Sequence, residues 1–527
     1  MSIASVQSTP VERQPDEAPL YGISSLIDEL LSEQGSLQTP VAKFSEYHDR
    51  EPDLAPHYRQ LIPLEKPGKG EQYAFEVALD RCTGCKACVS ACHSLNGLDE
   101  DESWRDVGAM VGGDAAPGWQ QTVTSACHHC EDPGCLNGCP VGAYEKEKDT
   151  GIVRHLDDQC IGCSYCILTC PYDVPKYSKK RGIVRKCDMC HQRLTEGEAP
   201  ACVQACPTEA IRIVTVKTGE APQAESVFME GQGDGSGLPE SDITLPTTRY
   251  AGRRLPATAY AADRDALVAQ HSHWPLVLML VLTQSGLGVL LATCLQPAAE
   301  VAFSFVGVTL FMAGMVSAVF HLGQPLKAWR FFLGLRTSWL SREILAFSVL
   351  LPLPLLWIGF NFIPDFPLKD SLFTAVRLLM PSLALVAVFT SVMIYHDTKR
   401  TLWRIDRTSF RFFGTLLLMG VIVLNQPWIF SILMTAKLAW EYSFLRLRTQ
   451  KSWSPDGHSS RLMAGPLRSA CMLRGAVALC AVGASFISPW PAIFLLLGAE
   501  LLERMIFFRA VSAPKMPGNF GPRSAQA

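Results

Sequence analysis

Long apolar segments fill the second half of the chain, whereas the first half alternates short apolar stretches with polar and charged residues. Eight apolar segments follow residue 272, at approximately 273–295, 301–322, 344–363, 373–396, 409–425, 427–445, 467–487 and 490–509. A helix needs about 20 apolar residues to cross the hydrocarbon core of a bilayer. The fifth segment nearly continues into the sixth, so the count is seven or eight, with eight favoured. The pattern predicts an all-α membrane bundle of about eight transmembrane helices.

The polar half contains strand-like stretches and one candidate amphipathic helix. Residues 151–154 and 210–216 are typical of strands, and residues 23–31 (ISSLIDELL) have apolar positions at helical spacing after a serine cap. That helix either packs on its own domain or docks a partner protein. Residues 217–250 are rich in Gly, Pro, Ser and Glu, which is typical of a linker.

These patterns divide the chain into five predicted regions. They are an N-terminal extension (1–71), a cysteine-rich domain (72–216), a linker (217–265), a membrane domain (266–510) and a C-terminal tail (511–527).

Basic residues then give an orientation. The net charge is only −3, and Lys and Arg gather at the ends of the apolar segments. The chain therefore has no basic domain of the kind that binds nucleic acid. One side of the predicted bundle carries Arg253, Arg254, Arg264, Lys327, Arg330, Arg336, Arg342, Lys399, Arg400, Arg404, Arg407, Arg446, Arg448, Lys451, Arg461, Arg468, Arg509, Lys515 and Arg523. The loops on the other side carry only Lys369. The positive-inside rule therefore predicts a multi-pass protein of the cytoplasmic (inner) membrane, with both termini and the cysteine-rich domain on the cytoplasmic side.

The N-terminal sequence agrees with that orientation. Its first 19 residues lack an apolar core and a twin-arginine pair, so no export signal is expected.

Cysteine spacing indicates the chemistry. Sixteen of the nineteen cysteines fall in four runs, and the last three runs end in Cys-Pro. The runs are Cys82, Cys85, Cys88 and Cys92; Cys127, Cys130, Cys135 and Cys139; Cys160, Cys163, Cys166 and Cys170; and Cys187, Cys190, Cys202 and Cys206. Three closely spaced thiolates hold three irons of a cubane, while the fourth cysteine reaches a partner cluster. The spacing predicts a ferredoxin-like α+β domain with four [4Fe–4S] clusters, and it leaves open which runs pair.

Two other uses of the cysteines fit less well. Structural zinc sites commonly use two C-x2-C pairs separated by a long gap, without a third cysteine after each pair. A disulfide framework belongs to small secreted domains. The remaining Cys294, Cys471 and Cys480 lie in apolar helices, where free cysteine behaves as a small hydrophobe.

The stretch from His321 to Glu343 joins the second and third apolar segments on the predicted cytoplasmic side. Ionisable groups at membrane depth tend to mark sites, and His or Glu can accept a hydroxyl proton. His321 and Glu343 are therefore candidates for a quinol site, with quinol or quinone as an exchangeable substrate. Arg330, Trp339 and Arg342 lie in the same vicinity, although anchoring of helix ends explains the two arginines better.

Haem is not expected. An electron-transfer haem needs axial ligands, usually histidines on facing helices. His321 and His396 are the only histidines near helices after the first, and both are at the cytoplasmic edge. Electrons then have no evident path across the membrane.

Several charged residues lie within the apolar segments. Lys437 and Glu441 are four residues apart, which predicts a pair within one helix. Arg377 and Arg474 are expected to snorkel. Glu500, Glu503 and Arg504 near the last helix end are expected to form a separate internal network.

The motifs also carry a family resemblance. Over about residues 72–216 the chain resembles the four-cluster electron-transfer subunit of dimethyl sulfoxide reductase and related molybdenum enzymes. The motifs that carry this resemblance are CEDPGCLNGCP, CIGCSYCILTCPYDVP and KCDMC…PACVQACPTEAI. Over about residues 270–510 the chain resembles the anchor subunit of that enzyme. The matching motifs are HLGQPLKAWR, SWLSREI, IYHDTKRTLW and LLLGAELLERMIFF. The chain resembles a natural fusion of the two subunits.

The resemblance implies a partner, a quinol site and a ligand arrangement. The partner is a separate molybdopterin-containing catalytic subunit, and the quinol site uses a histidine matching His321 and an acidic residue near Glu343. The first cysteine run pairs with the fourth and the second with the third. The implied ligand sets are Cys82, Cys85, Cys88 and Cys206; Cys92, Cys187, Cys190 and Cys202; Cys127, Cys130, Cys135 and Cys170; and Cys139, Cys160, Cys163 and Cys166.

The predicted orientation departs from the family pattern, because exported members place the iron–sulfur subunit outside the cytoplasmic membrane. A cytoplasmic molybdoenzyme, such as an assimilatory nitrate reductase, is therefore favoured over dimethyl sulfoxide reduction. The predicted function is oxidation of membrane quinol with electron transfer through four clusters to a separate reductase, where terminal catalysis occurs. Two alternatives stay open: the same path used in reverse by a dehydrogenase or hydrogenase, and a non-catalytic membrane anchor.

Overall fold

The structure is a computed structural model. It describes residues 58–112, 118–219, 235–253, 255–256, 258–296, 301–365, 367–450, 452–513 and 515–518, with five isolated positions nearer the N-terminus. The helix predicted at residues 23–31 lies outside the continuously described ranges. Residues 55–527 form one compact unit, which contains both the cysteine-rich domain and the membrane helices.

Two three-stranded sheets frame the cysteine-rich domain. The first has the order β8-β1-β9, from Ile211–Lys217, Glu71–Ala78 and Arg249–Ala251, and β1 runs antiparallel to β8 and parallel to β9. The second has the order β10-β2-β3, from Tyr260–Ala261, Asp106–Gly112 and Trp119–Ser125. Two short hairpins, β4–β5 (Tyr144–Lys146, Val153–His155) and β6–β7 (Lys176–Ser178, Ile183–Arg185), complete the strands. The strands predicted near residues 151–154 and 210–216 correspond to β5 and β8.

Part of the predicted linker belongs to these sheets. In β9, Tyr250 pairs with Val77 of β1 and is fully buried, and in β10, Ala261 pairs with Met110 of β2. Residues 249–251 and 260–261 are therefore part of the cysteine-rich domain. Their composition resembles a linker, and only strand pairing far along the chain distinguishes them.

Five short helices lie among the cysteine runs, and all except α7 contain cysteines. They are α4 (Ala87–Asn96), α5 (Gly134–Asn137), α6 (Tyr165–Thr169), α7 (His191–Thr195) and α8 (Ala201–Gln204). Helix α4 packs on α8, and α5 packs on α6. Because α4 bears the first run and α8 the fourth, while α5 bears the second and α6 the third, the helix packing brings the cysteine runs together in two pairs.

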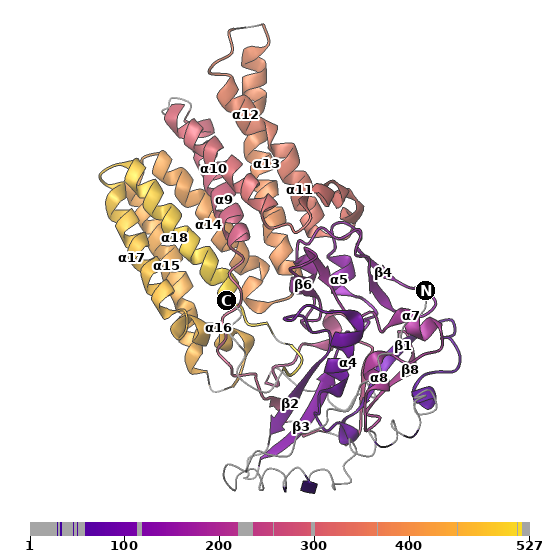
Figure 1. The fold of residues 1–527 in the computed structure, drawn as a ribbon. Helices are drawn as coiled ribbons and strands as arrows, with labels where there is room; N and C mark the ends of the chain where they lie inside the picture. The colour runs from indigo at the N-terminus through magenta and orange to yellow at the C-terminus, as the bar shows by residue number, and fades with distance from the viewer. Residues whose placement is uncertain are drawn as a thin grey trace, which may run out of the picture. The chain divides into compact units, whose positions relative to one another are not determined.

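The second half of the chain is helical (Figure 1). Its helices are α9 (Trp274–Leu295), α10 (Val301–Val319), α11 (Trp339–Leu350), α12 (Pro352–Gly359), α13 (Lys369–Asp397), α14 (Ile405–Val423), α15 (Pro427–Ser443), α16 (Pro455–Ala464), α17 (Arg468–Ser485) and α18 (Pro489–Arg509). Helix α9 is central, since it packs against α10, α13, α14 and α18.

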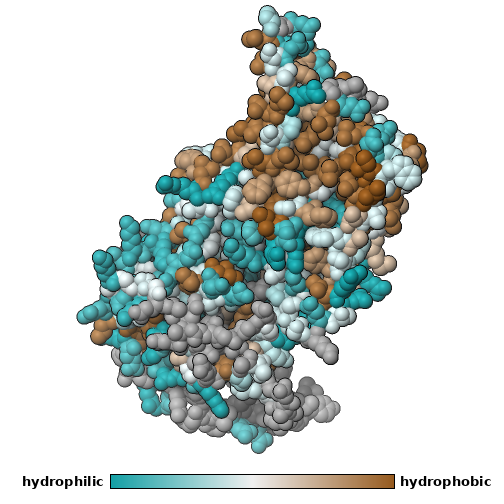
Figure 2. Space-filling model, turned by 180° about the vertical axis from the view of Figure 1, so that it is seen from behind, coloured by the Kyte–Doolittle hydropathy of each residue, from teal (hydrophilic) through white to brown (hydrophobic). Residues whose placement is uncertain are grey.

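Among the described residues, four helical stretches are long and apolar enough to cross a membrane: α9, α10, α11 with α12, and α13. The bent pair α16–α17 raises the count to five if it is one span. Helices α14, α15 and α18 are shorter or interrupted by charge, so eight spans remain a prediction. Figure 2 shows exposed hydrophobic side chains gathered over the helical part, as expected for a lipid-facing surface.

The third span begins earlier than its apolar run suggests. Helix α11 starts at Trp339 rather than near residue 344, so Glu343 lies inside the helix, and its side chain is 5% exposed. Both Ser341 and Glu343 are buried although they are polar, which explains why hydropathy alone misplaced this start.

Candidate iron–sulfur and quinol sites

The structure gathers the sixteen cysteines into four groups of four. The first quartet (Cys82, Cys85, Cys88, Cys206) lines one pocket, and the third quartet (Cys127, Cys130, Cys135, Cys170) lines another. In the second quartet, Cys92 lies near Cys187, Cys190 and Cys202. In the fourth quartet, Cys166 lies near Cys139, Cys160 and Cys163. These are the four groupings that the resemblance implies.

Backbone geometry suits metal-bound sulfur. Backbone N–H groups donate to four cysteine sulfurs: Ala143 to Cys139 at 3.2 Å, Gly162 to Cys160 at 3.4 Å, Met189 to Cys187 at 3.4 Å and Ala210 to Cys206 at 3.2 Å. Left-handed residues directly precede the cysteine-bearing helices α4 and α6, at Lys86 (φ 64°) and Ser164 (φ 58°), and Cys190 (φ 50°) directly precedes α7. Backbone N–H groups that donate to the sulfurs are one of the factors that set the reduction potentials of iron–sulfur clusters.

The quartets do not have the geometry of a single-metal site. Across the part of the chain that the structure describes, no three His, Cys, Asp or Glu side chains lie close enough to hold one metal ion. Tetrahedral zinc requires its sulfurs about 2.3 Å from one ion. Four cysteines spread around a pocket fit a larger polynuclear group, which when bound would accept and donate single electrons.

The loop after α10 connects the membrane helices to the fourth quartet. His321, which is half-buried, lies close to the backbone of Cys163. Burial lowers the pKa of His321 below its ordinary value, although the contact with Cys163 opposes that shift. The Gln324 backbone N–H donates to the Ile161 carbonyl at 3.0 Å. His321 therefore lies directly beside a predicted cluster ligand.

The start of α11 docks on the other side of the same quartet. Ser338 Oγ donates to the Gly138 carbonyl at 2.7 Å, and Ser341 Oγ donates to the Pro140 carbonyl at 3.2 Å. Two residues after Ser341, Glu343 accepts a hydrogen bond from Ser391 of α13. The loop with His321 and the start of α11, which precedes Glu343, thus both contact the backbone of residues next to cysteines of the fourth quartet.

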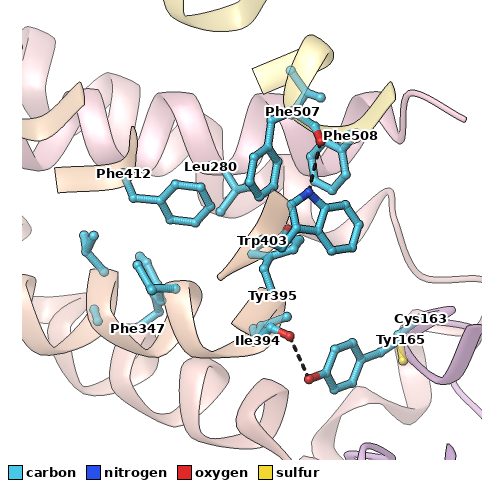
Figure 3. Close-up of a cluster of buried hydrophobic side chains, with 14 of the residues drawn as sticks. Cys163, Tyr165, Leu280, Phe347, Ile394, Tyr395, Trp403, Phe412, Phe507 and Phe508 are labelled. Carbon is cyan, nitrogen blue, oxygen red and sulfur yellow. Dashed lines mark hydrogen bonds between the residues drawn. The ribbon is translucent and has the colours of Figure 1, made fainter. Parts of the chain in front are cut away.

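Aromatic side chains complete this junction (Figure 3). Tyr165, between Cys163 and Cys166, donates its hydroxyl to the Ile394 carbonyl of α13 at 3.0 Å. The neighbouring Tyr395 packs edge-on against Trp403 and Phe507, with ring centroids 5.3 and 5.2 Å apart. Both tyrosines lie in the electrostatic vicinity of Glu343. Tyr165 was missed in the sequence, although its position inside a cysteine run was a usable signal.

The other three predicted quinol-site residues have structural contacts. Arg330 Nη1 donates to the Asp158 carbonyl at 3.0 Å, which fastens its loop to the cysteine-rich domain. Arg342 stacks over Trp339 at 4.3 Å from the ring centroid and donates to the Arg336 carbonyl at 2.7 Å. Both arginines therefore have contacts within the protein, and a role at the quinol site stays a prediction for them.

One further histidine near the junction was overlooked. His273 directly precedes α9, and burial, followed by the neighbouring His271 and His321, lowers its pKa to about 3. It is therefore neutral at physiological pH. Its position at the start of the first apolar segment was the available signal.

The charged residues inside the bundle pair mostly across helices, whereas Glu503 and Arg504 of α18 pair at 3.6 Å as predicted. Lys437 binds Glu500 of α18 at 2.5 Å rather than Glu441 of its own helix. Glu441 instead pairs with Arg474 at 3.2 Å, and Arg474 also binds Glu500 at 3.3 Å. Arg474 is 2% exposed and does not snorkel. Glu503 pairs with Arg411 of α14, so the network links α14, α15, α17 and α18.

Comparison with known proteins matches both halves. A 4Fe-4S dicluster domain family matches residues 119–216, and the DMSO reductase anchor subunit family matches residues 269–449. The sequence is 42% identical over 148 residues to the B subunit of anaerobic dimethyl sulfoxide reductase from Escherichia coli K12, covering 27% of this protein and 72% of the relative. The corresponding Haemophilus influenzae protein is 39% identical over 188 residues, covering 33% and 87%. The iron-sulfur subunit of a nitrate-inducible formate dehydrogenase of Escherichia coli is 36% identical over 179 residues, covering 29% and 59%.

Proposed function

Because the chain belongs to the family of dimethyl sulfoxide reductase-type electron-transfer subunits, with the iron–sulfur and membrane-anchor subunits fused in one polypeptide, we propose that it oxidises membrane quinol. The electrons pass through four [4Fe–4S] clusters, one held by each quartet, to a separate molybdopterin-containing reductase. The observation that carries this proposal is the contact between His321 and the backbone of Cys163. A hydrogen-bonding side chain at the membrane edge, beside a proposed cluster ligand, supports this assignment.

Quinol oxidation releases two electrons and two protons. His321 is placed to hydrogen-bond one hydroxyl of the quinol, and Glu343 is the neighbouring carboxylate that takes up a proton. Ser391 donates a hydrogen bond to the Glu343 carboxylate. Ser341, on the same helix as Glu343, donates to the Pro140 carbonyl and so fastens that helix to the cysteine-rich domain. The clusters, when bound, supply the one-electron acceptors.

The basic loops support a cytoplasmic position for the iron–sulfur domain. With quinol oxidation and the reductase on the same side of the membrane, the protons return to the compartment in which the substrate is reduced. The cycle is then electroneutral, and a cytoplasmic molybdoenzyme, such as an assimilatory nitrate reductase, is the expected partner.

One similarity favours a second candidate. The match to a formate dehydrogenase subunit raises the reverse direction, from a dehydrogenase to quinone. Cluster potentials above that of the quinone couple support quinol oxidation, and potentials below it support the reverse.

The test is a His321→Ala variant of the full chain in native membranes. Quinol oxidation should be lost, while iron content and cluster reduction by dithionite remain at wild-type levels. His396→Ala is the matched control, because His396 lies at the same membrane edge at the end of α13. Undiminished quinol oxidation by His321→Ala would remove the site assignment.

A further inference from the structure

Two buried cations lie between successive cysteine quartets. Arg105 and Lys186 are each 2% exposed. Arg105 has sulfurs of the first quartet (Cys88) and the second quartet (Cys92, Cys187, Cys202) as its electrostatic neighbours. Lys186 has Cys127 and Cys135 of the third quartet on one side and Cys187 of the second on the other.

Direct contacts fix both positions. Lys186 Nζ lies 3.5 Å from Cys127 Sγ and donates to the Cys187 carbonyl at 2.7 Å. Arg105 Nη1 donates to Thr124 Oγ1 at 3.3 Å, and that hydroxyl lies 3.6 Å from Cys88 Sγ. Each cation therefore lies within one or two contacts of a predicted ligand sulfur.

Neither cation is neutralised by a carboxylate within the described ranges. Arg185, another buried arginine of the domain, shows the usual arrangement, since it pairs with Glu102 at 3.2 Å. Arg105 instead faces the ring of Phe75 at 4.7 Å and leaves Nη2 without a hydrogen-bond partner. For Lys186 the nearest acidic neighbour is Asp188, with which it forms no direct ion pair. A buried cation without a partner is costly, so nearby negative charge must compensate it.

The junction between the third and fourth quartets differs. Tyr144 is buried there, with Cys135 on one side and Cys139 and Cys166 on the other, and a phenol carries no positive charge. His155 lies beside Cys160 but binds Asp157 at 2.8 Å, so this pair adds no net positive charge. Uncompensated positive charge is therefore concentrated around the first three quartets.

We propose that Arg105 and Lys186 raise the reduction potentials of the clusters in the first three quartets relative to the cluster of the fourth. This inference rests on the proposed four-cluster function. Reduction adds an electron, so a nearby fixed cation stabilises the reduced cluster, and net charge is one of the factors that set cluster potentials. The resulting gradient favours electrons that enter at the fourth quartet, beside the membrane, and leave toward the first.

The test is an EPR-monitored redox titration of the complex in native membranes. Arg105→Gln should shift the clusters of the first and second quartets to lower potential, and Lys186→Gln should do so for the second and third. The charge-retaining Arg105→Lys and Lys186→Arg variants should stay close to wild type. Lys179→Gln, which removes the same charge from a side chain that is 76% exposed, is the matched control.

The possible results separate the inference from the proposed function. Wild-type protein without iron–sulfur signals would overturn the proposed function itself. Wild-type clusters with potentials unchanged in both neutral variants, or shifted no more than in Lys179→Gln, would overturn the tuning role. If either Arg105→Gln or Lys186→Gln loses its clusters, the remaining one of these two variants tests the tuning role, because both cations flank the second quartet. If both Arg105→Gln and Lys186→Gln lose their clusters while the charge-retaining variants keep them, the cations serve folding, and the tuning role is overturned.

Discussion

Gly323, in the loop between the second and third membrane segments, lies directly against the backbone of Gly182 in the cysteine-rich domain. A Cβ added at Gly323 would overlap the Gly182 carbonyl oxygen, and one added at Gly162 would lie 3.0 Å from the Gly323 Cα. Three backbones thus meet without intervening side chains. This close approach brings His321, two residues before Gly323, to the fourth quartet.

A Gly323→Ala substitution should therefore separate the quinol loop from the cluster domain. Because small displacements at a reacting site can cost up to about 100-fold, we expect quinol oxidation to slow by about 10- to 100-fold. Steady-state quinol oxidation in membranes measures the effect, while iron content should stay unchanged.

Gly483→Ala is the control for that experiment, because a Cβ at Gly483 in α17 meets nothing within 4 Å. Equal rates for the two alanine variants would show that the glycine contact does not position the site.

Cysteine substitutions test the quartets directly. Cys92→Ser and Cys202→Ser should disturb the same EPR signal, whereas Cys88→Ser should disturb the signal that Cys206→Ser disturbs. This crossover is expected because Cys88 and Cys92 belong to one sequence run but to different quartets. Cys480→Ser, at an exposed cysteine outside the runs, should leave all signals intact. Matching signals for Cys88→Ser and Cys92→Ser would contradict the arrangement.

The buried ion network should contribute to stability. Lys437→Met leaves Glu500, which is fully buried, without its closest cation, and such a loss typically costs about 3 kcal/mol. Thermal unfolding of the detergent-purified protein should show a lower midpoint temperature. Lys437→Met combined with Glu500→Gln should recover part of the loss.

Lys369→Met serves as the comparison, since its partner Asp365 is 97% exposed and little change is expected there. An unaltered midpoint for Lys437→Met would mean that the network is not stabilising.

The orientation can be checked with reporter fusions. Green fluorescent protein at the C-terminus should fluoresce, because the basic loops predict a cytoplasmic tail. Alkaline phosphatase fused after Asp365 should be active, because that loop lies on the side with few basic residues. The opposite pair of results would invert the predicted topology and move the iron–sulfur domain outside.

The sequence predicted the chemistry better than the tertiary contacts. Cysteine spacing is local, so the four runs are visible without a structure, but spacing left open how Cys92 and Cys139 pair. The packing of α4 on α8 brings the first run to the fourth, and the packing of α5 on α6 brings the second run to the third. The composition around strand β9 predicts a linker, and its pairing with the distant strand β1 is not visible in the local sequence.

Charged positions within the membrane helices were the least predictable. Lys437 and Glu441 satisfy the spacing for a pair within one helix, yet each finds its partner on a neighbouring helix. Periodicity describes one helix at a time, whereas the choice of ion pair depends on which helices pack together. Tyr165 and His273 each carried a signal in their sequence position, but their contacts with distant segments could not be predicted from the sequence.

The most direct test of the account is quinol-driven reduction of the purified full chain, followed by EPR after rapid mixing. Wild-type protein should contain about 16 irons, four for each of four cubanes. Its clusters should become reduced by quinol without any added catalytic subunit, and His321→Ala should abolish this reduction. Clusters that dithionite reduces but quinol leaves oxidised, in wild-type protein at any quinol concentration, would contradict the proposed role as a quinol-oxidising electron-transfer subunit.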